Sequence, residues 1–288
     1  MQIGFIGLGN LGTPLAENLL EQHKQLFIYN RTASKAQSLI NNGAVLCETV
    51  KELAQLCDII FTMVSDDAAL NHITKNEDGL AANMKEGAIH ISMSTILPAT
   101  ANYLGSLHHL HRNNYVAAPV MGRPEAARIK KLNFLVSGKT EHIETIKPFL
   151  QHAGAAGIWE FGKEIEAANV AKLCSNFLII SAIETMAEGI TLANKSGIDA
   201  TAWMNMLTST IFDAPIYKNY GNIILKEQFQ PAAFSLKLGL KDVNLVNEQA
   251  TEKNAEMPIG KLLQQRLSEC VANGLGEHDW TAIALALK

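Results

Sequence analysis

The sequence predicts a doubly wound α/β domain followed by an all-helical domain. Short apolar strand patterns alternate with amphipathic helix patterns up to about residue 162, as in a parallel sheet covered by helices. No strand pattern follows Lys163, and helical periodicity continues from there to the end of the chain. A glycine-rich turn also joins the first strand to the first helix, which is where open parallel sheets bind ligands. We therefore expect domains at residues 1–162 and 163–288, joined by a long helix.

Composition narrows the class of protein. The chain has 288 residues, of which 48% are hydrophobic, and a net charge of −4, so we expect a sizeable core and no nucleic-acid partner. The four cysteines are scattered with no C-x-x-C pair, which is typical of reduced thiols in a cytoplasmic protein. The apolar stretch 167–183 is short for a membrane span and contains Lys172. It therefore predicts a buried helix, and we expect no membrane partner.

The N-terminal glycines form a dinucleotide-binding pattern. Gly7, Gly9 and Gly12 spell G-x-G-x-x-G between an apolar strand and an amphipathic helix. In a Rossmann domain the first glycine allows the turn, the second admits the pyrophosphate and the third lets helix and strand pack closely. The pyrophosphate would lie on the free N–H groups of the helix. We predict that the following residues bind the cofactor: Gly7, Leu8, Gly9, Asn10, Leu11 and Gly12.

The end of the second strand bears on the choice of cofactor. Leu26–Tyr29 is followed by Asn30, Arg31 and Thr32, at the place where a Rossmann domain meets the adenosine ribose. An acidic residue here would bind the 2′-hydroxyl, whereas the guanidinium of Arg31 can hold a 2′-phosphate. We therefore expect NADP(H) to be preferred over NAD(H). The alternative is an Asx turn with a solvated arginine.

Further strands end in polar loops that face the same edge of the sheet. We expect Val64 and Ser65, which follow an apolar strand at 58–63, to lie beside the cofactor. Ser94 and Thr95 follow a strand at 88–92 and precede a helix that begins at Pro98. They are placed either to meet a nicotinamide or substrate or simply to cap the helix. The other expected elements are helices at 34–40, 50–56 and 141–152, and strands at 44–47, 115–118, 132–138 and 157–162.

Three histidines near one another, His108, His109 and His111, could suggest a metal site. No carboxylate or thiol nearby completes a ligand set. We interpret them as a solvated helix end and expect no metal.

The second half of the chain is expected to hold one long helix at 164–194 and shorter helices at 200–207, 234–253, 258–273 and 280–287. A long apolar helix is a natural place for subunit contacts, and we expect a homodimer or homotetramer.

Two groups of residues in this half could carry chemistry. Lys172 is the only charged residue between Glu166 and Glu184, and Asn176 lies four residues on, on the same helix face. An ammonium and an amide so placed can polarise a carbonyl and hold a hydroxyl, and burial lowers a lysine pKa towards the range useful for acid–base work. A lysine that snorkels to water fits the pattern equally well. Lys241 and Asp242 alone indicate only a solvated charge pair.

Five motifs together resemble the β-hydroxyacid dehydrogenase family, which includes 3-hydroxyisobutyrate dehydrogenase, tartronate semialdehyde reductase and glyoxylate and succinic semialdehyde reductases. The motifs match in order along the whole chain. They are the glycine loop at 5–12, M-S-T-I-L-P at 93–98, part of the substrate loop at 118–122, the catalytic helix at 169–176 and the K-D pair at 241–242. The resemblance implies a 6-phosphogluconate dehydrogenase-like fold and an NAD(P)-dependent oxidoreductase.

The resemblance also implies roles for single residues. Lys172 would exchange a proton with the substrate oxygen as hydride passes to or from the nicotinamide, and Asn176 would orient the substrate. Thr95 would lie near the nicotinamide, and Lys241 would close over the cofactor. The substrate, a small hydroxy or carbonyl acid, would meet Ser94, Met121, Gly122, Arg123 and Asp242.

One motif departs from the family pattern. The substrate loop of the family usually reads D-A-P-V-S-G-G, whereas this chain has Met121 at the serine and Arg123 at the last glycine. A thioether cannot donate a hydrogen bond as a hydroxyl does. The departure motivates one alternative, an imine or other non-acid carbonyl reductase, and the retained Lys172 counts against it. A second alternative is a non-catalytic NADPH-binding scaffold, against which the presence of Lys172, Asn176, Lys241 and Thr95 counts.

Overall fold

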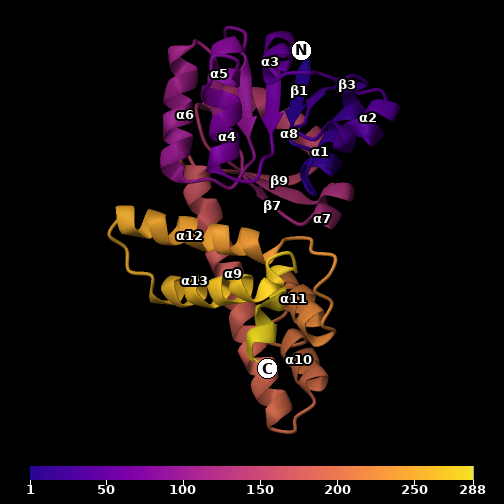
Figure 1. Cartoon of the computed structure of the whole chain (residues 1–288), viewed down its shortest axis with the longest axis vertical. Coiled ribbons are helices and arrows are strands. Elements are labelled where there is room, and N and C mark those ends of the chain that lie inside the picture. Colours follow the sequence, from indigo (N-terminus) through magenta and orange to yellow (C-terminus); the bar gives the residue numbers. More distant parts are fainter. Residues whose placement is uncertain (288) are drawn as a thin grey trace. The chain divides into compact units, whose positions relative to one another are not determined.

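The computed structural model describes residues 1–287. The chain divides into two compact units, Met1–Lys172 and Leu173–Lys288. The first is an α/β unit and the second is helical (Figure 1).

The first unit is built on a six-stranded parallel sheet, which confirms the predicted doubly wound fold. Its strand order is β3-β2-β1-β4-β5-β6, and every neighbouring pair is parallel. The order reverses between β1 and β4, so this sheet has its switch point beside the first strand, where dinucleotides bind in such folds. The strands are β1 (Ile3–Ile6), β2 (Phe27–Tyr29), β3 (Val45–Leu46), β4 (Ile59–Thr62), β5 (Ile89–Ser92) and β6 (Asn114–Ala117).

Helices cover both faces of this sheet. Because side chains alternate along a strand, Phe5 and Phe61 belong to one core, with α1 (Gly12–His23) and α8 (Thr140–Ala153). Ile60 belongs to a second core on the opposite face, with α3 (Val50–Leu56) and α5 (Leu80–Asn83). A third core joins α4 (Asp67–Lys75) to α6 (Pro98–Leu110). Three short elements complete the helices of this unit: the 3-10 turn Ala33–Ala36, α2 (Gln37–Asn41) and α7 (Pro124–Arg128).

The strands predicted at 132–138 and 157–162 form, but they do not extend the main sheet. They are β8 (Leu132–Val136) and β9 (Ala155–Glu160), which pair in parallel within a separate three-stranded sheet. Its third strand, β7 (Val120–Met121), is antiparallel to β8. β7 could not be predicted from periodicity, because two residues carry no repeat. An isolated β-bridge pairs Ala117, the last residue of β6, with Ser137, just after β8.

The described residues after 172 form helices joined by turns and loops, with one isolated β-bridge between Ser235 and Asp279. The helices are α9 (Ala167–Lys195), α10 (Ala200–Thr208), α11 (Pro215–Leu225), α12 (Leu236–Glu252) and α13 (Pro258–Cys270), followed by a π-helical turn at Val271–Leu275 and a 3-10 helix at Trp280–Leu287. The sequence did not predict α11. One apolar core, with Ile183, Leu236 and Trp280 among its buried members, holds these helices together.

α9 is long and apolar enough to span a membrane by length and composition alone, with a mean hydropathy of 1.4 in its most apolar window. Half of that window is buried inside the protein. One such helix is weak support for a membrane span, because core helices of globular domains pass the same test.

Candidate active site

The glycine loop has the backbone geometry that a dinucleotide site needs. Gly7 has a φ of +100°, and a Cβ there would lie 2.2 Å from the carbonyl oxygen of Met63. A Cβ on Gly12 would lie 2.0 Å from the carbonyl oxygen of Gly7, so α1 can begin this close to β1 only with glycine. At Gly9, by contrast, a Cβ would meet nothing within 4 Å. The loop therefore keeps open space at its exposed tip, beside the N-terminus of α1, as a bound pyrophosphate requires.

Asn30 supports this loop from the end of β2. Its Oδ1 accepts a hydrogen bond from the backbone N–H of Leu8 at 2.8 Å, and its Nδ2 donates to the carbonyl of Thr32 at 2.8 Å. Arg31 and Thr32 are exposed. Asn30 thus fixes the loop, while the side chains of Arg31 and Thr32 are open to solvent.

The loops that follow β4 and β5 are tied to each other. The backbone N–H of Val64 donates to Oγ of Ser94 at 2.9 Å, and the N–H of Leu97 donates to Oδ1 of Asp67 at 3.0 Å. Through its hydrogen bond with Val64 the fully buried hydroxyl of Ser94 joins the two loops. Thr95 is half-buried and Ser65 is exposed. Asp67 is the first residue of α4, so its bond with Leu97 ties the start of α4 to the loop after β5, a contact that the sequence did not predict.

Lys172 and Met121 are in contact. Nζ of Lys172 donates to Sδ of Met121 across 3.4 Å. Lys172 is 9% exposed, so it is not the snorkelling lysine that the pattern also allowed. Met121 packs against the core formed by α4 and α6, and the ammonium is therefore flanked by apolar groups on this side.

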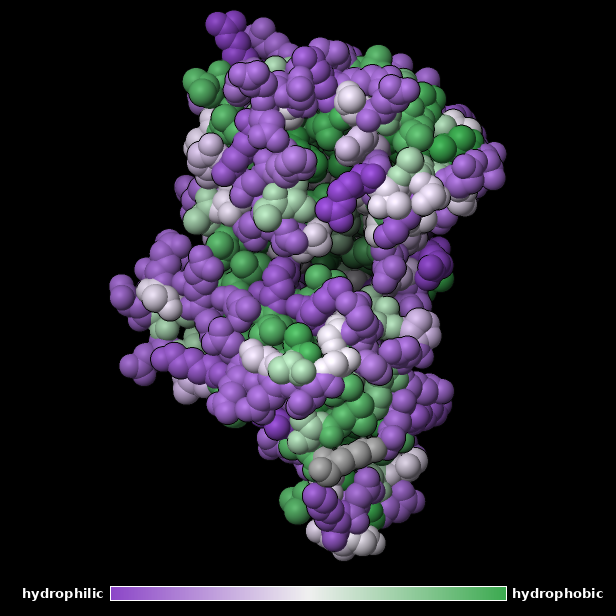
Figure 2. All heavy atoms as spheres, viewed as in Figure 1, coloured by the Kyte–Doolittle hydropathy of each residue, from purple (hydrophilic) through white to green (hydrophobic). Residues whose placement is uncertain are grey.

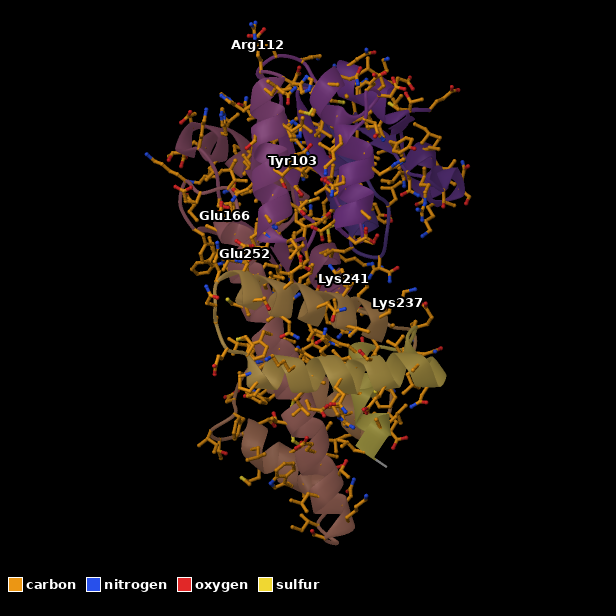
Figure 3. The ribbon with its side chains drawn as sticks, turned by 60° about the vertical axis from the view of Figure 1, so that its left-hand side comes forward. Tyr103, Arg112, Glu166, Lys237, Lys241 and Glu252 are labelled. Atoms are coloured by element: carbon orange, nitrogen blue, oxygen red, sulfur yellow. The ribbon has the colours of Figure 1, made fainter. Side chains whose placement is uncertain are left out.

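Asn176, Asp242 and Lys241 form a second group, within the helical unit. Asn176 lies one turn beyond Lys172 on α9, and its Nδ2 donates to Oδ2 of Asp242 at 2.5 Å. Nζ of Lys241 lies 2.7 Å from Oδ1 of the same carboxylate. Asp242 is 2% exposed, so the K-D pair is not the solvated pair that its spacing suggested. Figure 3 shows Lys241 on α12, between Lys237 and Glu252.

The remaining residues of the predicted substrate loop are nearer the surface. Gly122 is exposed, and its φ of +145° disfavours any larger residue. Nε of Arg123 lies 3.9 Å from a carboxylate oxygen of Glu125, and the Arg123 side chain is 26% exposed.

The structure corrects the interpretation of His108. His109 and His111 are exposed, as expected of a helix end, but His108 is fully buried. Its Nδ1 lies 2.5 Å from Oδ1 of Asn113, and its Nε2 lies 2.9 Å from Nδ1 of His90. His108 continues the spacing of the buried residues Ala101 and Leu104 on α6, a signal that the sequence offered.

The tautomers of His108 and His90 follow from the residues at the two ends of this hydrogen-bond network, Asn113 and Thr62. Asn113 donates its Nδ2 to the carbonyl of Ala81, so its Oδ1 must accept from His108. Nε2 of His108 then accepts from His90, whose own Nε2 accepts from the hydroxyl of Thr62 at 2.8 Å. Both rings are neutral in this arrangement. Burial lowers the pKa of His108 to about 4 and that of His90 well below its usual value of 6.5.

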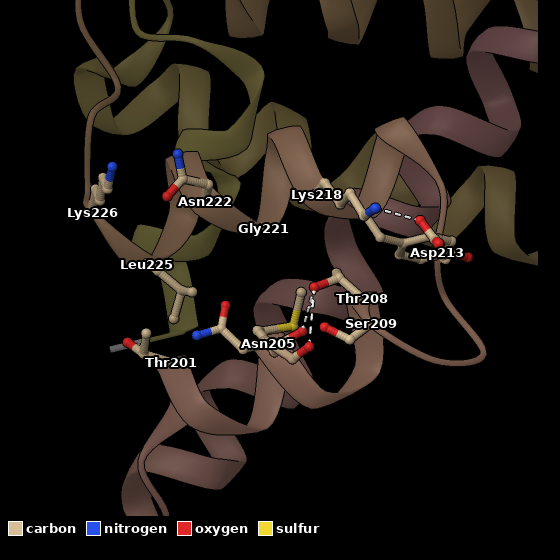
Figure 4. A pocket seen from close by; sticks show the side chains of 12 residues that line it. Thr201, Asn205, Thr208, Ser209, Asp213, Lys218, Gly221, Asn222, Leu225 and Lys226 are labelled. Carbon is tan, nitrogen blue, oxygen red and sulfur yellow. Dashed lines mark hydrogen bonds and ion pairs between the residues drawn. The ribbon is translucent and has the colours of Figure 1, made fainter.

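No group of three His, Cys, Asp or Glu residues suited to a metal ion occurs among residues 1–287. A cavity of about 460 Å³ lies between α10 and α11 (Figure 4). Its walls carry hydroxyls and amides, including Thr201, Asn205 and Asn222, and an ion pair of Lys218 with Asp213. None of the predicted site residues lines it.

Comparison with known proteins decides the family. Residues 2–167 match the model described as the NAD binding domain of 6-phosphogluconate dehydrogenase. Residues 167–287 match the model described as NAD-binding of NADP-dependent 3-hydroxyisobutyrate dehydrogenase. The chain belongs to the β-hydroxyacid dehydrogenase family. Both the predicted family and the predicted fold are thus confirmed.

Individual members of the family align along the whole chain. An uncharacterized oxidoreductase of Bacillus subtilis, YfjR, is 36% identical over all of both chains. Glyoxylate/succinic semialdehyde reductase 1 of Arabidopsis thaliana is 28% identical over 100% of this chain and 99% of its own. The solved 3-hydroxyisobutyrate dehydrogenase of Mycobacterium tuberculosis, with L-serine, has a TM-score of 0.89 at 22% identity over all of both chains. This last likeness shows the fold.

Membership of the β-hydroxyacid dehydrogenase family gives the class of activity. The protein is an oxidoreductase that binds a pyridine nucleotide and acts as a hydroxyacid dehydrogenase or reductase. The glycine loop fits that cofactor, because the backbone is closely packed at Gly7 and Gly12 and open at Gly9.

Proposed function

We propose that this β-hydroxyacid dehydrogenase family member reduces a small aldehyde or keto acid with NADPH, or oxidises the matching β-hydroxyacid with NADP⁺, and that Lys172 is its general acid and base. The observation that carries the proposal is the buried ammonium of Lys172 against the thioether of Met121. A thioether is a weak acceptor, so this contact competes little with a substrate oxygen for the proton.

When bound, the nicotinamide supplies or accepts the hydride, and the chain's own residues do the rest. Lys172 gives its proton to the carbonyl oxygen during reduction and takes it back from the hydroxyl during oxidation. Asn176 orients the substrate beside it. The residues of the glycine loop, with Val64, Ser65, Thr95 and Lys241, hold the cofactor, and Ser94 and Asn30 keep those loops in place.

NADP(H) is preferred over NAD(H) in this proposal because of Arg31. Its exposed guanidinium follows β2, and no acidic residue stands at positions 30–32 to repel a 2′-phosphate. The description of the matched family model as NADP-dependent supports the same preference.

The substrate is proposed to be an acid of a few carbons, held by the loop at Met121, Gly122 and Arg123. The names of the relatives, which include a reductase of glyoxylate and succinic semialdehyde, support this class. Because Met121 offers no hydrogen-bond donor, Arg123 is the side chain in this loop that could hold the carboxylate.

We further propose a cytoplasmic homodimer or homotetramer without nucleic-acid or membrane partners. Apolar residues reach the surface of the helical unit, as the green areas in Figure 2 show. Those more than half exposed include Leu178, Leu192, Ile198, Met206 and Ile211. Large exposed apolar residues on this unit favour self-association, which light scattering after gel filtration would test.

The test of the proposed function is a substrate screen. The protein is incubated with NADPH and a panel of aldehyde acids, keto acids, uncharged aldehydes and imines, and the loss of NADPH absorbance is followed. Oxidation of NADPH in the presence of an aldehyde acid or a keto acid supports the proposal. Oxidation confined to the imines or uncharged aldehydes would replace it with a non-acid reductase, and no oxidation with any compound would favour a scaffold.

A further inference from the structure

Met121 is open to a small oxidant. It is the last residue of β7, an edge strand of the three-stranded sheet. Met121 is half-buried, and the next residue, Gly122, is exposed. Oxidation of a side chain follows its exposure, and hydrogen peroxide is little larger than water. Four other methionines are shielded from peroxide, because Met84, Met93, Met186 and Met204 are buried.

The sulfur of Met121 is also in contact with a cation. It accepts a hydrogen bond from Nζ of Lys172 across 3.4 Å, and Lys172 is 9% exposed. A thioether is a weak acceptor, so it leaves the ammonium ready to release a proton. A sulfoxide is polar and carries partial negative charge on its oxygen. Against a buried ammonium it forms a charge-assisted hydrogen bond, which favours the charged form of the lysine over the neutral amine.

We propose that Met121 is a site of reversible oxidation, and that its sulfoxide slows the enzyme by holding the proton on Lys172. This inference rests on the proposed function. The oxidant is hydrogen peroxide. Its O–O bond breaks as an S–O bond forms, the sulfur is oxidised by two electrons, and the other peroxide oxygen leaves as water with both hydrogens. Methionine sulfoxide reductases return the sulfoxide to the thioether.

A more stable ammonium slows the reaction in both directions. During reduction the proton is harder to give to the carbonyl oxygen, and during oxidation fewer molecules hold the neutral amine that takes it. We expect kcat to fall by roughly tenfold or more, the scale of a hydrogen bond to a charged group. The pH profile of hydroxyacid oxidation should move upward by about one unit, the same tenfold factor. A merely structural disturbance would lower kcat without moving the profile.

The test is treatment of the whole protein with hydrogen peroxide, followed by catalase and then dithiothreitol, which reverses sulfenic acid or disulfide at the exposed Cys174. Mass spectrometry of peptides gives the extent of oxidation at each methionine. The wild type should lose turnover as Met121 is oxidised and regain it with methionine sulfoxide reductases A and B. Met121→Leu cannot form this sulfoxide and should keep the turnover that it has before treatment.

Met206→Leu is the matched control, since Met206 is 51% exposed and lies on α10. It should lose turnover with peroxide as the wild type does. Equal losses in the wild type and Met121→Leu would overturn the inference. So would an unshifted pH profile with Met121 oxidised, or a Met121 that stays a thioether while Met206 is fully oxidised.

An inactive wild type before any treatment would refute the proposed function instead. In that case the effect of the sulfoxide is measured on Lys172 itself, by its rate of acetylation with acetic anhydride, which reacts with the neutral amine. The oxidised protein should acetylate Lys172 roughly tenfold more slowly, while the exposed Lys163 reacts at an unchanged rate. The same rate at Lys172 before and after oxidation would overturn the inference.

Discussion

The ammonium of Lys172 donates a hydrogen bond to the thioether of Met121 over 3.4 Å. This pairing puts the most unusual residue of the substrate loop directly beside the proposed proton donor. The character of residue 121 therefore bears on which substrates the lysine can serve.

Substitution of Met121 should change substrate preference more than stability. In Met121→Ser a hydroxyl donor replaces the thioether, and we expect kcat/KM for acids with an extra hydroxyl to rise about tenfold relative to their methyl analogues, the scale of one hydrogen bond. Met121→Leu keeps an apolar side chain of similar volume and should retain the wild-type ratio. Steady-state kinetics with matched hydroxyl and methyl aldehyde acids measures both. An unchanged ratio in Met121→Ser would show that the side chain does not meet the substrate.

Arg31→Ala should weaken NADPH binding far more than NADH binding. Loss of a charge-assisted hydrogen bond to phosphate costs about 1.5–3 kcal/mol, or roughly 10- to 100-fold in Kd. NADH has no 2′-phosphate, so its affinity should change little. Fluorescence titration with each nucleotide gives the two ratios, and equal losses would refute the proposed role of Arg31.

Alanine at Gly9 and at Gly12 should separate cofactor binding from folding. A Cβ at Gly9 meets no protein atom within 4 Å, whereas one at Gly12 lies 2.0 Å from a backbone oxygen. We expect Gly9→Ala to keep the free energy of unfolding within about 1 kcal/mol of the wild type and to weaken NADPH binding. Gly12→Ala should lower both the free energy of unfolding and the affinity for NADPH. Urea unfolding and nucleotide titration test this, and normal NADPH affinity in Gly9→Ala would contradict the placement of the pyrophosphate.

The buried histidine pair should make the protein sensitive to acid. The folded pKa of His108 is about 4 and that of His90 is well below 6.5, so between these values and pH 6.5 the unfolded chain binds protons that the folded protein does not. Stability from the neutral pair is therefore fully present above pH 6.5 and is lost as the pH falls towards 4, by up to about 1.4 kcal/mol per pH unit for each histidine.

Urea unfolding at several pH values measures this slope. His108→Gln should reduce it by the share of one histidine, while His109→Gln, at an exposed position on the same helix, should leave it unchanged. The same slope in wild type and His108→Gln would show that His108 titrates normally.

Much of this fold could be predicted from the sequence, because local sequence patterns determine many of its elements. Buried parallel strands are continuous apolar runs, and G-x-G-x-x-G demands a strand before it and a helix after it, so β1, β4, β5 and α1 were predictable. β7 and the separate three-stranded sheet could not be predicted. Tertiary contacts determine how strands pair, and a strand of two residues has no sequence pattern that indicates its partner.

The site was predictable to a different degree. Spacing alone left Lys172 open between a catalytic and a snorkelling lysine. Its burial rules out the snorkelling lysine, and its catalytic role stays a prediction. The joining of Asn176 to Asp242, 66 residues apart, could not be read from either segment, since each is unremarkable without the other. The prediction that His108 lies at a solvated helix end was wrong. It relied on the polar residues next to His108 and not on its spacing from the apolar residues of α6.

The most direct test of the account is the turnover of Lys172→Ala with NADPH and the best carbonyl acid from the screen. Removing the general acid should lower kcat by roughly 10²-fold or more while the Kd for NADPH stays near the wild-type value. Lys163→Ala, at an exposed lysine shortly before α9, should keep full turnover. A kcat of Lys172→Ala close to that of the wild type would contradict the proposed mechanism.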